Sequence, residues 1–215
     1  MKFIKKSEEP EIFQQWKSQA NENWQPTWDV LRAKEKRQLH QSLLAEQGFI
    51  CCYCQRQISI EDSHIEHLKP RTRYPDLALE YTNLLASCKG ESEEPPPVPV
   101  HCGHHKKDWY DEDLLVSPLD ENCEQLFTYT ELGEIRPISD PQWQKSAETT
   151  IDQLGLDIDK LRAMRREAIE AILEGFEDLT ESDKHQLIEG FKTTDNEGKY
   201  TEFCMVLVYI LKQYL

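Results

Sequence analysis

The chain has 215 residues, of which 38% are hydrophobic and 30% charged, and its formal net charge is −15 at pH 7. This length and composition predict a soluble globular protein of one or two domains and exclude an intrinsically disordered chain. The stretch MKFIKKSEEPEIFQQW contains no apolar signal segment, and no apolar run approaches membrane-spanning length. We therefore expect a cytoplasmic protein that does not contact a membrane.

The negative charge is unevenly distributed along the chain. Residues 1–50 carry eight Lys and Arg against seven Asp and Glu, and residues 51–110 carry seven against nine. Residues 111–215 carry ten against twenty-four. Because nearly all the excess acidity lies in the second half, the first half could still bind a polyanion such as nucleic acid.

Hydrophobic spacing predicts elements in chain order. Two helices are expected between residues 10 and 47, the second ending at Gly48, and a proline-rich insertion follows at 94–100. Residues 126–138 alternate apolar and polar side chains around Gly133, which predicts a hairpin, and amphipathic helices are expected from about 141 onward. We expect an α+β fold with a helical N-terminal segment, a cysteine- and histidine-rich core and an acidic, mainly helical C-terminal region, at 1–48, 49–118 and 119–215.

Four of the seven cysteines have the spacing of a structural zinc site. Cys51 and Cys54 form a C-x-x-C pair, whose two thiolates can point into one tetrahedral site from a tight turn. Cys88 and Cys102 follow at longer intervals and would complete a site of four ligands, with His101 as the alternative to Cys102. The odd number of cysteines and the absence of a signal segment favour thiols or a metal over disulfides.

Three further segments, IEHLKP, YTNLLASC and CGHHKKD, follow the cysteine pair in this order. This order resembles that of the HNH endonucleases with the ββα-metal fold, in the form whose cysteines bind zinc around the catalytic motif. More narrowly, the segments resemble the PtuB-type HNH nucleases of Septu and retron anti-phage systems. The matching positions are Glu66, His67, Pro70, Asn83, Leu84, Cys88, His104 and Lys107.

The resemblance implies a role for each matching polar residue. His67 would be the general base that activates water, since the ordinary pKa of histidine lies close to working pH. Glu66 and His104 would bind a catalytic Mg²⁺ or Mn²⁺, with the adjacent His105 as the alternative to His104. Asn83 would orient His67 through a hydrogen bond to its ring or fix the loop that follows it.

The resemblance also implies partners. These are an ABC-type ATPase of the PtuA kind, a nucleic-acid substrate of DNA, tRNA or other RNA, and a retron reverse transcriptase with its RNA–DNA. Five basic side chains are placed to contact phosphates: Lys69, Arg71, Arg73, Lys106 and Lys107.

Two other functions compete with a nuclease. A zinc-bearing interaction module without catalysis would not need Glu66, His67 and His104 together, and a redox protein using Cys51 and Cys54 would not need two further cysteines.

Apolar faces in the acidic half suggest a docking surface. About half of these positions should be core, and the remainder, with Trp143, should dock on the ATPase. The positions are Ile151, Leu154, Leu161, Ala168, Ile172, Phe203, Val206, Leu207, Ile210 and Leu211. His40 and His185, in amphipathic helices, are expected at the surface.

Overall fold

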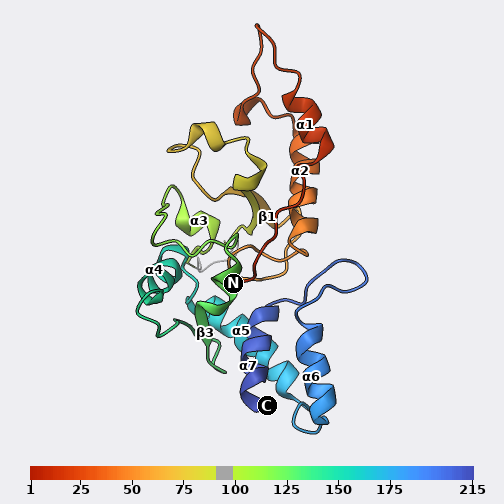
Figure 1. Cartoon of the computed structure of the whole chain (residues 1–215), viewed down its shortest axis with the longest axis vertical. Coiled ribbons are helices and arrows are strands. Elements are labelled where there is room, and N and C mark those ends of the chain that lie inside the picture. The colour runs from red at the N-terminus through yellow and green to blue at the C-terminus, as the bar shows by residue number, and fades with distance from the viewer. Residues whose placement is uncertain (91–98) are drawn as a thin grey trace.

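A computed structural model describes residues 1–90 and 99–215 (Figure 1). Most of the proline-rich insertion predicted at 94–100 falls on residues 91–98 and lies outside the described residues. Within the described part of the chain, no helix is both long and apolar enough to cross a membrane.

The two helices predicted near the N-terminus are present. Helix α1 spans Glu11–Lys17 and α2 spans Ala33–Glu46, with a single 3₁₀ turn at Trp28–Val30 between them. Helix α2 buries Leu39, Leu43 and Leu44, which lie on one face at helical spacing. The helix ends before Gly48, whose φ of 60° is a conformation that glycine adopts without strain.

A small antiparallel sheet forms the middle of the chain. Strand β1, Ser63–His67, pairs with β2, Leu84–Cys88, so that Ser63 lies opposite Cys88 and His67 opposite Leu84. All five residues of β2 are buried, and α2 packs against this strand. The one-turn helix α3, Gly103–Lys106, lies on the other side of β1 from α2 (Figure 1).

The hairpin predicted at 126–138 is confirmed. Strand β3, Phe127–Tyr129, pairs with β4, Ile135–Pro137, and Gly133 in the turn has a φ of 79°. Helices then follow to the C-terminus: α4 Gln144–Leu154, α5 Asp159–Leu173, α6 Glu181–Gly190 and α7 Cys204–Leu211.

More of the apolar positions on these helices are core than the predicted half, which corrects that part of the predicted docking surface. Leu154 and Leu161 are fully buried, Ile151 is 7% exposed, and Ala168, Ile172 and Trp143 pack partly buried against the core. Helix α7 packs on α5 and buries six of its eight side chains, whereas Met205 and Tyr209 are half-buried. Phe203, Val206, Leu207, Ile210 and Leu211 are all buried, so these five predicted docking positions are core.

Hydrogen bonds between residues far apart in the sequence join the N-terminal segment, the cysteine-rich middle and the C-terminal helices. The N-terminal amine of Met1 donates to the Tyr129 hydroxyl over 3.0 Å, at the C-terminal hairpin. The backbone N–H of Phe203 donates to the carbonyl of Gln55, beside the cysteine pair. One hydrophobic core therefore runs from the N-terminal residues to α7.

Candidate functional site

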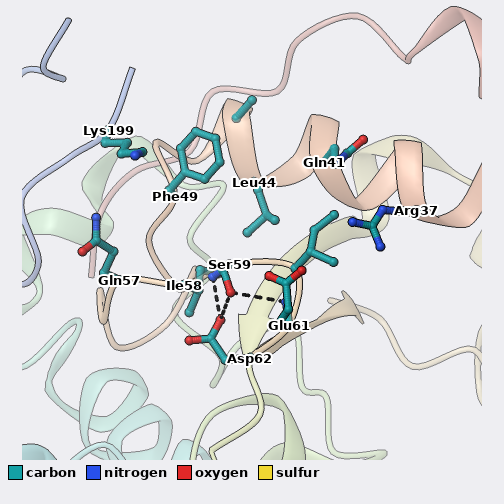
Figure 2. Close-up of a pocket in the computed structure, with 12 residues that line it drawn as sticks. Arg37, Gln41, Leu44, Phe49, Gln57, Ile58, Ser59, Glu61, Asp62 and Lys199 are labelled. Atoms are coloured by element: carbon teal, nitrogen blue, oxygen red, sulfur yellow. Dashed lines mark hydrogen bonds between the residues drawn. The ribbon is translucent and has the colours of Figure 1, made fainter. Parts of the chain in front are cut away.

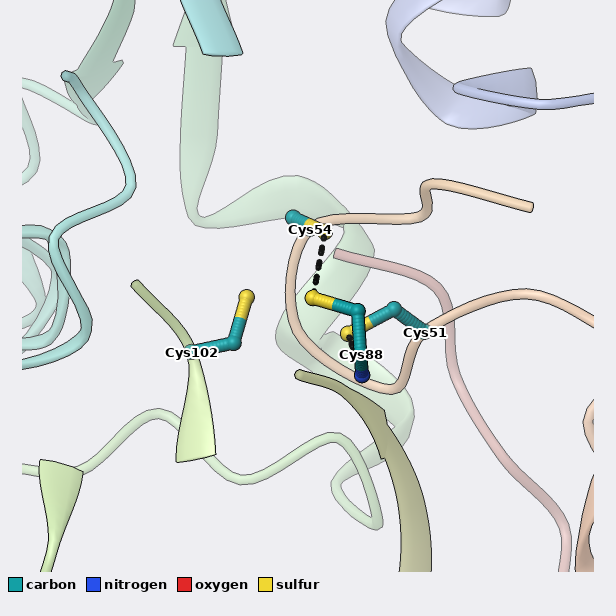
Figure 3. Close-up of side chains that lie close together, drawn as sticks. All are labelled: Cys51, Cys54, Cys88 and Cys102. Atoms are coloured by element: carbon teal, nitrogen blue, oxygen red, sulfur yellow. Dashed lines mark hydrogen bonds between the residues drawn. The ribbon is translucent and has the colours of Figure 1, made fainter. Parts of the chain in front are cut away.

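The four predicted zinc ligands meet at one buried point. The sulfur atoms of Cys51, Cys54, Cys88 and Cys102 all lie within 4.8 Å of one another (Figure 3). The Sγ atoms of Cys54 and Cys88 are 3.8 Å apart, and a tetrahedral zinc with Zn–S bonds of about 2.3 Å separates its sulfurs by about 3.8 Å. This donor set could hold a structural metal such as zinc.

Nearby donors stabilise Cys51 as a thiolate. The backbone N–H of Cys88 donates to Cys51 Sγ over 3.3 Å, and the Ser87 hydroxyl lies 3.7 Å from the same sulfur. Ser87 Oγ also accepts a hydrogen bond from the N–H of Gly103, the first residue of α3. The cysteine cluster is thus linked directly to the start of this helix.

His101, the alternative fourth ligand, lies next to the cluster. Its Nδ1 is 3.2 Å from Cys102 Sγ and 3.7 Å from Cys88 Sγ, and the residue is fully buried. Since four sulfurs already complete a tetrahedral set, this geometry places His101 as a hydrogen-bonding neighbour of the thiolates.

A second polar cluster forms between β1 and α3. Side chains alternate along a strand, so His64 and Glu66 share the face of β1 that α3 covers. His64 Nε2 lies 3.3 Å from Glu66 Oε2, and the His104 ring stacks on the His64 ring at a centroid distance of 4.5 Å and an angle of 19°. A Cβ added at Gly103 would lie 2.5 Å from Glu66 Oε2 and 2.7 Å from His64 Nε2. The close approach of α3 to β1 therefore requires glycine at this position.

Glu66 is held as a buried carboxylate. Its Oε1 accepts from Lys106 Nζ at 2.8 Å and from the Tyr53 hydroxyl at 3.2 Å. Burial raises the pKa of Glu66, but the hydrogen bond with His64 and the Lys106 charge outweigh it, so the pKa lies below its ordinary value. Glu66 is therefore ionised at neutral pH, with Oε2 turned toward His64.

Lys106 corrects one of the predicted phosphate contacts. Its side chain is only 1% exposed, and besides the ion pair it donates to the backbone carbonyl of His67 over 3.1 Å. A buried ammonium held by two acceptors is not available to a phosphate. Lys69, Arg71, Arg73 and Lys107 remain exposed or half-buried.

His67 lies on the other face of β1. Its Nε2 donates to the Ala78 carbonyl over 3.1 Å, and its ring meets Trp28 edge to face at a centroid distance of 4.4 Å. Because a carbonyl only accepts, Nε2 carries the hydrogen, and in the neutral ring Nδ1 then has the free lone pair. Burial lowers the pKa of His67, and the Ala78 hydrogen bond and the Glu66 carboxylate offset only part of this. The ring is therefore neutral at pH 7 and able to accept a proton.

Asn83 fixes the loop between the strands. Its Oδ1 accepts from the N–H of Lys69 at 2.8 Å, and its Nδ2 donates to the carbonyls of Lys69 and Leu77 at 3.0 and 3.1 Å. These bonds correspond to the second of the two roles expected for Asn83. Among the described residues, no hydrogen bond joins it to the His67 ring.

The adjacent histidines of α3 point in different directions. His104 faces β1, where it stacks on His64, whereas the exposed His105 donates from Nδ1 to the carbonyl of Gln153 in α4 over 2.9 Å. Of the two candidates for a metal ligand on α3, His104 is therefore the one next to Glu66.

His40, expected at the surface, is buried. It is 8% exposed and its Nε2 lies 2.9 Å from the Ser63 hydroxyl. Burial, together with the nearby His64 and Lys36, lowers its pKa to about 4. His185 is exposed, as predicted.

Sequence reasoning did not single out His64, Tyr53 and Lys106 for the roles they have here. The alternation of β1 could have identified His64 as a neighbour of Glu66, because residues two apart share a strand face. Tyr53 and Lys106 gave no comparable signal, since their contacts with Glu66 depend on how the cysteine turn and α3 pack.

The cluster contains donor types that bind divalent cations, although within the described ranges only the four cysteines bring three or more such donors within 4.8 Å of one another. Glu66 Oε2 and His64 Nε2 lie 3.3 Å apart as a hydrogen-bonded pair, and the His104 ring lies against His64. A mixed carboxylate–imidazole set is also one that divalent metals use in proteins.

Comparison with known proteins agrees with the order of the motifs. The chain is 30% identical over 155 residues to the "Retron Vc95 putative HNH endonuclease" of Vibrio cholerae serotype O1 biovar El Tor, which covers 70% of this chain and 72% of that protein. It is 26% identical over 208 residues to the "Retron Ec83 putative HNH endonuclease" of Escherichia coli, covering 79% of each. No family profile matches the sequence. With a four-cysteine cluster, a mixed α and β fold and these similarities, the chain belongs to the family of retron HNH endonucleases.

Proposed function

We propose that this protein is a metal-dependent HNH endonuclease that hydrolyses phosphodiester bonds of nucleic acid, with a zinc-containing ββα-metal core, and that it is the nuclease effector of an anti-phage defence complex. One observation carries this proposal. An ionised Glu66 shares one face of β1 with His64, on which His104 of α3 stacks, and the next residue in the chain, His67, is neutral with a free Nδ1.

Hydrolysis of a phosphodiester needs a base for the attacking water and positive charge for the phosphate and the leaving oxygen. Glu66 and His104 would hold the divalent cation with His64 beside them, and the bound cation supplies Lewis-acid stabilisation of that charge. His67 Nδ1 would accept the proton of the attacking water, while the Ala78 carbonyl keeps Nε2 protonated and the ring oriented.

Other residues would position these groups. Lys106 and Tyr53 hold Glu66 Oε1, so that Oε2 faces the cluster. Asn83 would fix the loop after His67, because its side chain hydrogen-bonds both the N–H and the carbonyl of Lys69. The zinc, held by the four cysteines, would have a structural role only.

The partner that best fits the family is an ABC-type ATPase, as in the PtuA–PtuB pair, and a retron reverse transcriptase with its RNA–DNA would belong to the same complex. The charge distribution supports a division of work. Residues 111–215 carry ten basic against twenty-four acidic side chains and should repel nucleic acid, so the partner would supply affinity and gating.

The experiment that tests this proposal is a cleavage assay. The purified chain, alone and with its co-encoded ATPase, is incubated with plasmid DNA and total tRNA, with and without magnesium or manganese. We expect cation-dependent cleavage of one substrate, strongest with the ATPase present. Complex formation without cleavage of either substrate under any cation would favour the interaction module instead.

A further inference from the structure

A hollow on the α2 side of β1 differs from the rest of this acidic protein. It has a volume of about 560 Å³ and opens onto His67 and His64. Its charged lining residues are Lys36, Arg37 and Arg71, and no carboxylate lines it. In a chain of net charge −15, a hollow with three cations and no acidic lining next to the candidate general base is a place where an anion would bind.

Helix α2 supplies two of the three cations from outside the motif region. Lys36 and Arg37 lie one turn before His40, so all three face the hollow. Both side chains are exposed, and neither takes part in any ion pair found among the described residues. His40 is neutral at pH 7, since its pKa is about 4, so the unpaired positive charge comes from Lys36 and Arg37, while Arg71 is paired with Asp29.

The Trp28 ring lies between Lys36 and the candidate base His67 and contacts both. Lys36 Nζ lies 5.1 Å from the centre of the Trp28 ring, and that ring in turn meets His67 at 4.4 Å. Arg71 reaches the same hollow from the loop after β1, where it pairs with Asp29 at 2.8 Å. Lys36, Arg37 and Arg71 therefore line the same hollow as His67.

The hollow adjoins a larger one, of about 880 Å³, with which it shares Arg37 and Ile60. Figure 2 shows Arg37 and Lys199 at opposite ends of this second hollow. Glu61 and Asp62 also line it, so its charge is mixed. The acid-free hollow alone has the chemistry of an anion site.

We propose that Lys36 and Arg37 of α2, with Arg71, bind the phosphates that adjoin the scissile phosphodiester of a nucleic-acid strand. The proposal rests on the proposed nuclease function, since it assigns the strand a path next to His67. The ligand chemistry is the phosphodiester backbone, which single-stranded DNA, duplex DNA and RNA share.

Binding can be measured without cleavage, using short fluorescein-labelled single-stranded DNA, duplex DNA and RNA and the full chain at low salt, without added divalent cation. The test variant is Lys36→Glu/Arg37→Glu. The control is Lys145→Glu/Lys160→Glu, which makes the same charge change on α4 and α5, away from the hollow. Circular dichroism and melting temperature check that both variants fold.

We expect the α2 variant to lose about tenfold or more in affinity for the preferred strand, and the control to change little. The slope of log affinity against log salt should fall by about 1.4 for a single strand or about 1.8 for duplex DNA, as two lost phosphate contacts predict. The strand type with the largest loss identifies the ligand.

Equal losses in both variants, or no loss in the α2 variant, would overturn the proposal, because only overall charge would then matter. The two hypotheses can fail separately. If the wild-type chain does not cleave nucleic acid, and the α2 variant loses binding while the control does not, the phosphate site is supported and the nuclease function is wrong. If the wild-type chain cleaves nucleic acid and the α2 variant binds and cleaves equally well, the nuclease function is supported and the phosphate site is wrong.

Discussion

The Tyr53 hydroxyl donates a hydrogen bond to Glu66 Oε1 over 3.2 Å, from within the turn that carries Cys51 and Cys54. Both side chains are buried, and this bond joins the cysteine cluster to the candidate catalytic carboxylate. Tyr53→Phe keeps the ring and removes the donor. We expect the concentration of Mn²⁺ that gives half-maximal cleavage to rise about 10-fold to 100-fold, as is typical when a bond to a metal ligand is lost, with zinc content unchanged. An unchanged Mn²⁺ requirement would show that Tyr53 does not position Glu66.

His67→Ala should abolish cleavage. Loss of proton transfer alone accounts for about 10² to 10⁴ in rate. The measurement is single-turnover cleavage under saturating Mn²⁺, with zinc content and melting temperature as controls for the fold. Cleavage at the wild-type rate would remove His67 from the mechanism.

Cys102→Ser and His101→Ala separate the two candidates for the fourth zinc ligand. Structural zinc contributes directly to folding free energy, so the serine variant should lose bound zinc and melt at a much lower temperature or become insoluble. His101→Ala should retain zinc, as should Cys123→Ala, which changes a buried cysteine outside the cluster. Elemental analysis decides, and retention of zinc by Cys102→Ser with loss by His101→Ala would reverse the assignment.

Gly103→Ala should reduce cleavage more than it reduces the zinc content of the protein. The added Cβ would lie 2.5 Å from Glu66 Oε2 and must displace α3 or the carboxylate. We expect at least about a tenfold loss of cleavage, in line with the sensitivity of catalysis to displacements near 1 Å. Gly190→Ala is the control, since nothing lies within 4 Å of a Cβ at that position. Equal activity of the two variants would contradict the close approach of α3 to β1.

His40 predicts a dependence of stability on pH. Its pKa is about 4 in the folded chain and near 6.5 when unfolded, so between these values the unfolded state binds the proton and the folded state does not. Stability should therefore fall as the pH drops from about 6.5 toward 4. Thermal melting of His40→Gln, which keeps a donor for Ser63, should show a shallower loss over this window and a constant difference from wild type above pH 7. Parallel curves would show that His40 is not the group responsible.

Several features could be predicted from the sequence because local signals determine them. The hairpin around Gly133 and the spacing of α1 and α2 follow from alternation, helical period and glycine at positive φ. The convergence of four cysteines was predictable because a tetrahedral metal site demands four ligands.

Burial of polar and amphipathic residues could not be predicted in the same way. His40 has the spacing of a surface position, yet it is buried, where it lines the hollow beside β1 and hydrogen-bonds with the Ser63 hydroxyl. Helix α7 has apolar side chains all round, and only the packing of α5, α6 and β3 against it shows that most of them are core. From the sequence Lys106 was expected to contact phosphate, and only the packing of α3 against β1 shows that it pairs with Glu66.

Helix α3 is a single turn of four residues, and isolated helices shorter than about twelve residues are marginal in water. Both flanking residues, Cys102 and Lys107, have positive φ, at 58° and 51°, which costs about 1–3 kcal/mol each unless the surroundings enforce it. A metal held by the four cysteines would enforce this conformation at Cys102. His104 would then be presented to Glu66 only in metal-loaded protein, so chains synthesised under zinc starvation would accumulate without a formed candidate site until zinc became available.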